Sequence, residues 1–184
     1  MQADMVEAIF TLFERFGDAH YGEHASQRAH ALQCAELARQ AGCGPEMIAA
    51  ALLHDVGQFM DDAGNAAEYR GIDGRHEVSG AAFLARAFPP EVTEPVRLHV
   101  DAKRYLCAAE PGYQEALSGA SALSLKLQGG PMNPAEMLAF EQGPFFADAV
   151  LLRRFDDQGK RPDWVVPGLD SYRTLLGSLI RAEA

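Results

Sequence analysis

Apolar residues recur at steps of three and four along most of the chain, and this spacing constrains the fold more than any other feature. The first such segment places Met5, Ile9, Leu12 and Phe16 on one face of a helix and ends at Gly17. Apolar and polar residues nowhere alternate for long enough to indicate a convincing strand. We therefore expect an essentially all-α fold.

Local start and stop signals divide the chain into further helices. Ser26 supplies a capping hydroxyl, and Pro45 suits a first helical turn because the missing N–H has no helical partner there. From such signals we expect helices at 5–17, 26–42, 45–57, 76–87, 90–100, 113–127, from about 133, at 148–155 and at 169–182. Residues 61–74 are rich in Asp, Asn and Gly and are expected to form a long loop, while 159–167 are expected to be irregular.

Composition narrows the class of protein. The 184 residues fit one domain spanning 1–184, and 48% apolar with 23% charged residues is typical of a globular chain. With 16 basic against 26 acidic residues the net charge is −10, which argues against nucleic acid as a partner. There is no apolar run of about 20 residues and no basic segment at the start, so we expect no membrane span and a cytoplasmic location. Oligomeric state is not predicted.

The cysteines do not form a recognisable motif. Cys34, Cys43 and Cys107 are odd in number and lack C-x-x-C spacing. We expect neither a disulfide framework nor a thiolate zinc site, and interpret all three as small buried apolar residues.

The most informative polar residues are His54 and Asp55, which end a strongly apolar segment. A buried carboxylate without a partner is too unfavourable to retain, and a metal ion would supply a partner. His30, His54, His76 and His99 lie 24, 22 and 23 residues apart, so antiparallel helices could bring all four to one end of a bundle.

Such a cluster predicts a dinuclear site. Asp55 has two carboxylate oxygens and could bridge two ions, and an N/O ligand set without thiolate favours iron, manganese or other hard ions. A single histidine on an apolar helix is more often a hydrogen-bonded core residue, and this interpretation is kept for His20 and His24.

His30, the His54-Asp55 pair and a distant aspartate resemble the H…HD…D metal signature of the HD-domain superfamily, most members of which are phosphohydrolases. Further segments resemble the PhnZ/TmpB-type branch, mixed-valence diiron oxygenases that cleave carbon–phosphorus bonds. The segments are 21–23, Gln27 with 30–35, 51–57, 99–106, 128–132 and 156–160.

The resemblance implies specific roles for individual residues. It implies six metal ligands, namely His30, His54, Asp55, His76, His99 and Asp156, with Asp55 bridging two iron ions. It also implies that Lys103, Ser121 and Arg153 hold the phosphonate, which is chemically reasonable because a lysine, a hydroxyl and a guanidinium suit a dianion. Gln27, Glu23 and Gln58 complete the expected substrate-binding set, and His54, Asp55 and Lys103 are the expected catalytic residues. Without this resemblance, Lys103 and Arg153 would be interpreted as solvated charges on helix surfaces.

Two positions depart from the family, and two belong to an expected lid. Gln58 replaces a histidine that contacts the phosphonate, and it can donate a hydrogen bond but carries no charge. His20 stands where some members have a tyrosine that caps one iron. Tyr21 and Glu23 match a lid near the substrate amine, where an anion suits an ammonium group and an aromatic ring suits a quaternary one.

We expect O2-dependent cleavage of a 1-hydroxy-2-(amino or trimethylammonio)ethylphosphonate to phosphate and glycine or glycine betaine, with two iron ions (Fe2+/Fe3+). The alternative from another reaction class is an HD-domain phosphohydrolase, in which two metals activate water for attack on a phosphate ester. A non-catalytic metal-bound interaction domain is the third interpretation, but it has no need for a cationic pocket.

Overall fold

A computed structural model describes residues 2–20, 25–60 and 71–181 of the chain. Within these ranges every regular element is helical, so the predicted all-α fold is confirmed for the part described. The α-helices and two 3-10 helices (η) are α1 (Gln2–Phe16), α2 (Gln27–Gln40), α3 (Pro45–Leu53), η1 (Val56–Phe59), α4 (His76–Leu84), α5 (Pro90–Ala109), α6 (Gly119–Leu127), α7 (Pro134–Glu141), α8 (Phe146–Gln158), η2 (Leu169–Tyr172) and α9 (Arg173–Leu179).

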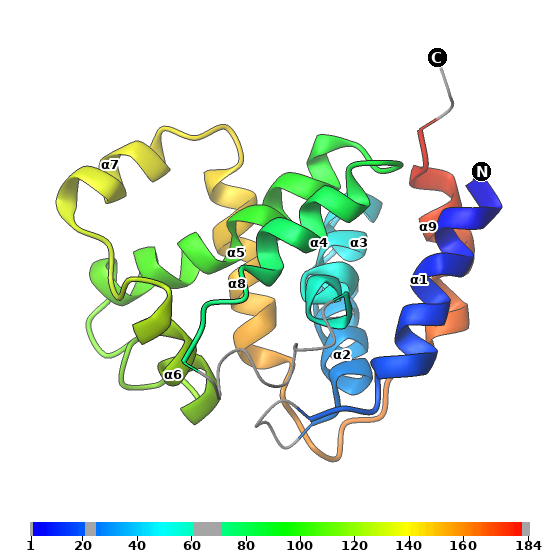
Figure 1. Cartoon of the computed structure of the whole chain (residues 1–184), viewed down its shortest axis with the longest axis horizontal. Coiled ribbons are helices and arrows are strands. Elements are labelled where there is room, and N and C mark those ends of the chain that lie inside the picture. The colour runs from blue at the N-terminus through cyan, green and yellow to red at the C-terminus, as the bar shows by residue number, and fades with distance from the viewer. Residues whose placement is uncertain (1, 21–24, 61–70, 182–184) are drawn as a thin grey trace.

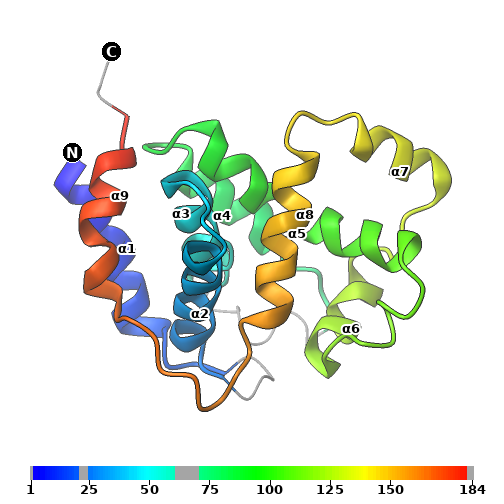
Figure 2. The same cartoon turned by 180° about the vertical axis from the view of Figure 1, so that it is seen from behind.

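The centre of the molecule is formed by α2, α3, α4, α5 and α8, which pack against one another. The two cartoon views show α1 and α9 side by side at one end of this group and α6 and α7 at the opposite end (Figures 1 and 2). The main apolar core joins α1, α9 and the central helices, and includes the fully buried Ile9, Leu53 and Leu152. The central helices are therefore held from both sides.

A second, smaller apolar cluster supports the end that carries α7. Ala102, Met132, Phe140 and Ala149 are buried in it, and the rings of Tyr105, Phe140 and Phe146 meet at tilted or edge-to-face angles, with centroids 5.1 to 5.6 Å apart. Such ring pairs are favourable because a positive ring edge meets a negative ring face. This cluster fixes the C-terminal half of α5 relative to α7 and α8.

Local signals account for most helix boundaries. The Ser26 hydroxyl accepts a hydrogen bond from the Ala29 N–H and caps α2, as predicted. Pro45 occupies the first turn of α3, as predicted. At the start of α7, Asn133 and Glu136 form a reciprocal capping box, which satisfies N–H groups that have no helical acceptor.

Several predicted boundaries were wrong. The helix predicted at 90–100 continues to Ala109, because buried Ala102 and Leu106 continue its apolar face beyond residue 100. The helix predicted at 113–127 begins only at Gly119, where the Ser118 hydroxyl accepts from the Ser121 N–H and caps it. The segment predicted as helical to 57 ends as an α-helix at Leu53 and continues into η1, and the last helix ends at Leu179.

The structure also tests the predictions for the cysteines and for a membrane span. Cys34 is buried, as predicted, but Cys43 and Cys107 are only half-buried, and all three thiols are free. Among the described helices, none is long and apolar enough to cross a membrane. The predicted loop falls largely on 61–70, which lies outside the described residues.

Candidate metal and substrate site

The six residues expected to bind metal come together where the central helices meet. His30 lies on α2, His54 follows the last residue of α3, and His76 is the first residue of α4. The other three are Asp55 after His54, His99 in the middle of α5, and Asp156 in the last turn of α8. The structure thus brings together residues separated by up to 126 positions in the sequence.

Asp55 faces two groups of histidines, one with each carboxylate oxygen. Its Oδ1 lies 3.2 Å from His76 Nε2 and 3.8 Å from His99 Nε2. Its Oδ2 lies 3.5 Å from His54 Nε2 and 3.8 Å from His30 Nε2. A carboxylate placed in this way has one oxygen available for each of two ions.

Asp156 completes the group around His30 and His54. Its Oδ1 lies 3.2 Å from His30 Nε2 and 3.8 Å from His54 Nε2. The candidate ligands therefore divide into two sets that share Asp55. One set holds His30, His54 and Asp156, and the other holds His76 and His99.

The histidine rings are oriented by backbone carbonyls. Nδ1 of His30 lies 2.8 Å from the Gly159 oxygen, Nδ1 of His54 lies 2.9 Å from the Ala51 oxygen, and Nδ1 of His99 lies 2.7 Å from the Val96 oxygen. When Nδ1 donates to a carbonyl, Nε2 of a neutral ring keeps its lone pair.

The Nε2 atoms nevertheless approach each other closely. They are 3.2 Å apart in the pair His30 and His54, and 3.2 Å apart in the pair His76 and His99. Converging lone pairs repel, and a cation between them would remove the repulsion. The donor set of imidazole and carboxylate therefore fits a pair of hard or borderline metal ions.

The proton affinities of the cluster couple protonation to metal binding. Burial raises the pKa of Asp55, but His54 and His76 outweigh it and hold that pKa well below its usual value. Burial lowers the pKa of His54, but Asp55 and Asp156 raise it to about 9. Burial, reinforced by His76 and His54, lowers the pKa of His99 to about 3. Asp55 is thus ionised and His99 neutral, as ligands must be, whereas the proton that His54 holds near neutral pH would be released when a metal ion binds.

Close backbone contact fixes His76 relative to Asp55. A Cβ atom on Gly57 would lie 1.9 Å from the His76 carbonyl oxygen and 2.8 Å from the Gly80 backbone nitrogen. Only a glycine permits η1 and α4 to approach this closely. The glycine that follows His54-Asp55 in the sequence is therefore part of the architecture of the site.

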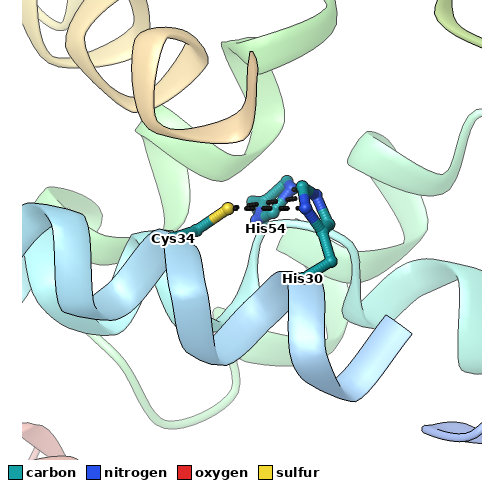
Figure 3. A group of neighbouring side chains, drawn as sticks. All are labelled: His30, Cys34 and His54. Carbon is teal, nitrogen blue, oxygen red and sulfur yellow. Dashed lines mark hydrogen bonds between the residues drawn. The ribbon is translucent and has the colours of Figure 1, made fainter. Parts of the chain in front are cut away.

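Cys34 lies beside His30 and His54, in a geometry that could hold a metal ion (Figure 3). Its sulfur is 3.7 Å from His30 Nδ1, and it donates a hydrogen bond to the Phe155 oxygen at 3.4 Å. Burial raises the pKa of this thiol, and Asp156 and Asp55 raise it further. Because the backbone carbonyl of Phe155 accepts a hydrogen bond from the thiol, the N/O ligand set stays the prediction.

A cavity of about 60 Å³ adjoins the cluster, and we call it the inner cavity. Each of the six candidate ligands except His54 lines it. This volume is well above the roughly 10–15 Å³ that a cavity needs to hold one water molecule. Its other polar lining residues are Gln27, Gln58, Lys103, Ser121, Ser124, Arg153 and Lys160.

Lys103 and Arg153 are not surface charges, since each residue is only 3% exposed. The Lys103 ammonium donates to Ser124 Oγ at 2.8 Å, and Lys160 Nζ donates to Ser121 Oγ at 3.2 Å. Lys103 of α5 and Lys160, which follows α8, thus each contact a serine of α6 in the wall of the inner cavity. Buried cations beside a cavity favour an anionic ligand.

The other predicted substrate residues divide into two groups. Gln27 and Gln58 line the inner cavity, and the side-chain oxygen of Gln27 is buried without a hydrogen-bond partner among the described residues. Tyr21 and Glu23, the expected lid, lie outside the described residues, as does His24. His20 is exposed and does not line the inner cavity.

Sequence reasoning missed two polar residues of the inner cavity. Lys160 stands out in the sequence only as the end of a segment that resembles the family, and Ser124 does not stand out at all. Ser124 lies three residues after Ser121, which places both on one face of a helix, so helical spacing was the available signal. Lys160 follows the end of α8, where no periodic pattern indicates the direction of a side chain.

Comparisons with known proteins identify the family of this chain. The model of the HD domain family matches residues 28–139. Hydroxymethylphosphonate dioxygenase of Gimesia maris is 45% identical over 178 residues, which cover 96% of this chain and 89% of that protein. The glycine-betaine-forming [1-hydroxy-2-(trimethylamino)ethyl]phosphonate dioxygenase of Leisingera caerulea is 44% identical over 180 residues, covering 97% and 92%. The predicted relationship to phosphonate dioxygenases is confirmed, and the chain belongs to the HD-domain family.

Proposed function

We propose that this protein is a metal-dependent dioxygenase that cleaves the carbon–phosphorus bond of a small 1-hydroxyphosphonate. The observation that carries the proposal is the shared carboxylate of Asp55, placed between two histidine groups and beside a cavity with buried cations. The names of the two relatives support the same reaction class.

The metal ions in this proposal are two irons. His30, His54 and Asp156 would hold one, His76 and His99 the other, and Asp55 would bridge them. Imidazole and carboxylate ligands suit iron, and the buried, carbonyl-oriented rings resist rearrangement. Bound iron supplies the redox chemistry with O2 that protein side chains lack.

The inner cavity would bind the phosphonate group. Lys103 and Lys160 carry positive charge, Ser121 offers a hydroxyl, and Arg153 has N–H groups beyond those already bonded to carboxylates. Burial strengthens these interactions because the local dielectric is low. Local cations thus attract a dianion although the net charge of the chain is −10.

The overall reaction balances without a further reductant. A 1-hydroxyphosphonate R–CH(OH)–PO3²⁻ and O2 give R–COO⁻, HPO4²⁻ and H⁺. The C1–P and C1–H bonds break, C1 is oxidised to the carboxylate, and O2 is reduced. With R as aminomethyl or trimethylammoniomethyl, the carboxylic acid is glycine or glycine betaine, and with R as hydrogen it is formate.

Within this reaction the side chains of the protein have distinct tasks. Lys103, kept in place by Ser124, and Lys160 would orient the phosphonate so that C1 faces the candidate ligand cluster. Gln58 would donate a hydrogen bond where a histidine donates in the family. The inner cavity would hold the reacting carbon beside the candidate ligands.

The test is to prepare the protein with Fe2+ and measure phosphate release with and without O2. Substrates are hydroxymethylphosphonate, 2-amino-1-hydroxyethylphosphonate and its trimethylammonium analogue, with a phosphate monoester as the substrate of the alternative phosphohydrolase. We expect O2-dependent release from at least one phosphonate and none from the ester. Release that is unaffected by removal of O2, or that occurs only from the ester, would contradict the proposal.

A matched pair of variants connects the activity to the inner cavity. Lys103→Met removes the buried ammonium, and Lys126→Met removes a lysine from the exposed side of the same helix α6 that carries Ser121. We expect the Lys103→Met variant to lose most of its activity and the Lys126→Met variant to keep it.

Four further statements stay predictions: iron as the metal, a single domain spanning 1–184, a cytoplasmic location and the absence of nucleic-acid binding.

A further inference from the structure

The two oxygens of Asp156 have different partners. Oδ1 faces the candidate ligand cluster, 3.2 Å from His30 Nε2. Oδ2 accepts a hydrogen bond from Arg153 Nη1 at 2.5 Å, on the opposite side of the carboxylate. This carboxylate therefore has one oxygen directed toward a metal and one already bonded to a cation.

Arg153 is itself held in place by two further residues. Its Nη2 donates to Asp157 Oδ1, and its Nε donates to the Tyr113 hydroxyl at 3.0 Å. The Tyr113 hydroxyl in turn donates to Asp157 Oδ2 at 2.5 Å. Tyr113, Arg153 and Asp157 thus form a closed set of hydrogen bonds, which we call the clamp.

The clamp combines local and long-range contacts. Arg153, Asp156 and Asp157 are three and four residues apart on α8, which places their side chains on one face of the helix. Tyr113 comes from the turn before α6, 40 residues away in the sequence. A guanidinium that is only 3% exposed and contacts two carboxylates and a phenol has very little rotational freedom.

The charges of the clamp residues also favour these hydrogen bonds of Arg153. Burial disfavours a charged Arg153, but Asp156 and Asp157 outweigh it and raise its pKa above the usual value. Burial also raises the pKa of Tyr113, so its hydroxyl keeps the proton that it donates to Asp157. Arg153 and Tyr113 therefore hold the protonation states that their hydrogen bonds require.

We propose that Tyr113 and Asp157 are positioning residues that act through Arg153 to keep Asp156 Oδ2 away from the metal. Asp156 would then offer only Oδ1 to the ion that it would hold with His30 and His54, which would leave room at that ion for a further ligand such as substrate or O2. Asp157 also balances the charge of Arg153, so that Asp156 remains a strong ligand. The inference rests on the proposed function, because it assumes that the cluster binds metal.

The experiment measures the binding of Mn2+ to the whole chain by equilibrium dialysis, for the wild-type protein and for Tyr113→Phe and Asp157→Asn. Mn2+ needs no control of oxidation state. The matched control is Tyr105→Phe, which removes another phenol-to-carboxylate hydrogen bond, that from Tyr105 to Glu141, at an exposed position. Thermal unfolding of each metal-free variant shows whether the fold survives.

We expect the wild-type chain to bind two Mn2+ ions. Each clamp variant should bind one of the two about tenfold more weakly and the other with unchanged affinity, because residues that orient a ligand typically alter metal affinity 10–100-fold. Tyr105→Phe should leave both affinities unchanged. Should Tyr113→Phe fail to fold, the nearly isosteric Asp157→Asn tests the same set of hydrogen bonds.

Three results would overturn the inference. Unchanged affinities in both clamp variants would show that Asp156 needs no positioning, and equal weakening of both ions would indicate a general structural role. A wild-type chain that binds no Mn2+ would refute both this inference and the dinuclear site. If the wild-type protein binds two Mn2+ ions but its Fe2+-loaded form releases no phosphate in the presence of O2, the proposed function fails, while the dialysis of the variants still decides the role of the clamp.

Discussion

Replacing Gly57 with alanine is expected to displace His76 from Asp55. The new Cβ would lie 1.9 Å from the His76 carbonyl oxygen, whereas an ordinary contact begins at 3.4 Å, so the two backbones must separate by about 1.5 Å. His76 Nε2 now lies 3.2 Å from Asp55 Oδ1, and a shift of this size would break that approach. The clash involves backbone atoms on both sides, so no change of rotamer can relieve it.

The magnitude follows from the cost of overpacking. Inserting one methyl group into a closely packed region typically destabilises a protein by about 1–3 kcal/mol. In a chain of this size 1 kcal/mol corresponds to about 2–4 °C in melting temperature, so Gly57→Ala should melt about 2–12 °C lower than the wild-type protein. Misplacement by about 1 Å can reduce turnover a hundredfold, so phosphate release should fall at least that far.

The assay combines thermal unfolding, elemental analysis of bound iron and O2-dependent phosphate release. Gly177→Ala is the matched control, because a Cβ at this position in α9 meets no atom within 4 Å. Alanine in a helix is more stable than glycine by roughly 0.5–1 kcal/mol, so this control should melt slightly higher and keep full activity. A Gly57→Ala variant with wild-type melting temperature, iron content and turnover would refute the reasoning.

Three further results are expected. Ser124→Ala removes the acceptor 2.8 Å from the Lys103 ammonium, and a hydrogen bond to a charged group is worth about 1.5–3 kcal/mol. In steady-state assays of phosphate release, the KM for the phosphonate should therefore rise about tenfold or more while kcat changes less. Asp55→Asn leaves an amide with a single acceptor oxygen, so elemental analysis should find at most one metal ion per chain, and two ions would exclude a bridging role. A chelator should lower the melting temperature, and Mn2+ at about a hundred times its dissociation constant should restore about 2.7 kcal/mol of folding stability. A melting temperature that neither the chelator nor Mn2+ changes would show that the folded chain has no metal site.

Helical content was predictable because it depends on local patterns. The steps of three and four apolar residues, the capping hydroxyl of Ser26 and the proline at position 45 each act within a few residues of where they stand. The same patterns ended the fifth helix too early and began the sixth too early. The continuation of α5 beyond residue 100 depends on burial against α7 and α8. The start of α6 at Gly119 depends on the cap formed by Ser118.

The candidate ligands were only partly predictable from local sequence. His54 and Asp55 stand out because two polar residues end an apolar helix, and the other histidines follow from regular spacing. Asp156 lies 101 residues beyond Asp55 among many acidic residues, and only resemblance to a family indicated it. The helical period specifies which residues share a face of one helix, but it contains no information about which helix that face meets.

By itself, then, the sequence determined the helical class, the imidazole and carboxylate chemistry and the relationship to HD-domain oxygenases. Only the tertiary structure decided that Asp55 divides its oxygens between two histidine groups, that Lys103 and Arg153 are buried, and that Arg153 occupies one oxygen of Asp156. Those facts depend on the packing of helices from distant parts of the chain. Such packing is set by the shape and burial of whole surfaces, and no short segment of sequence encodes it.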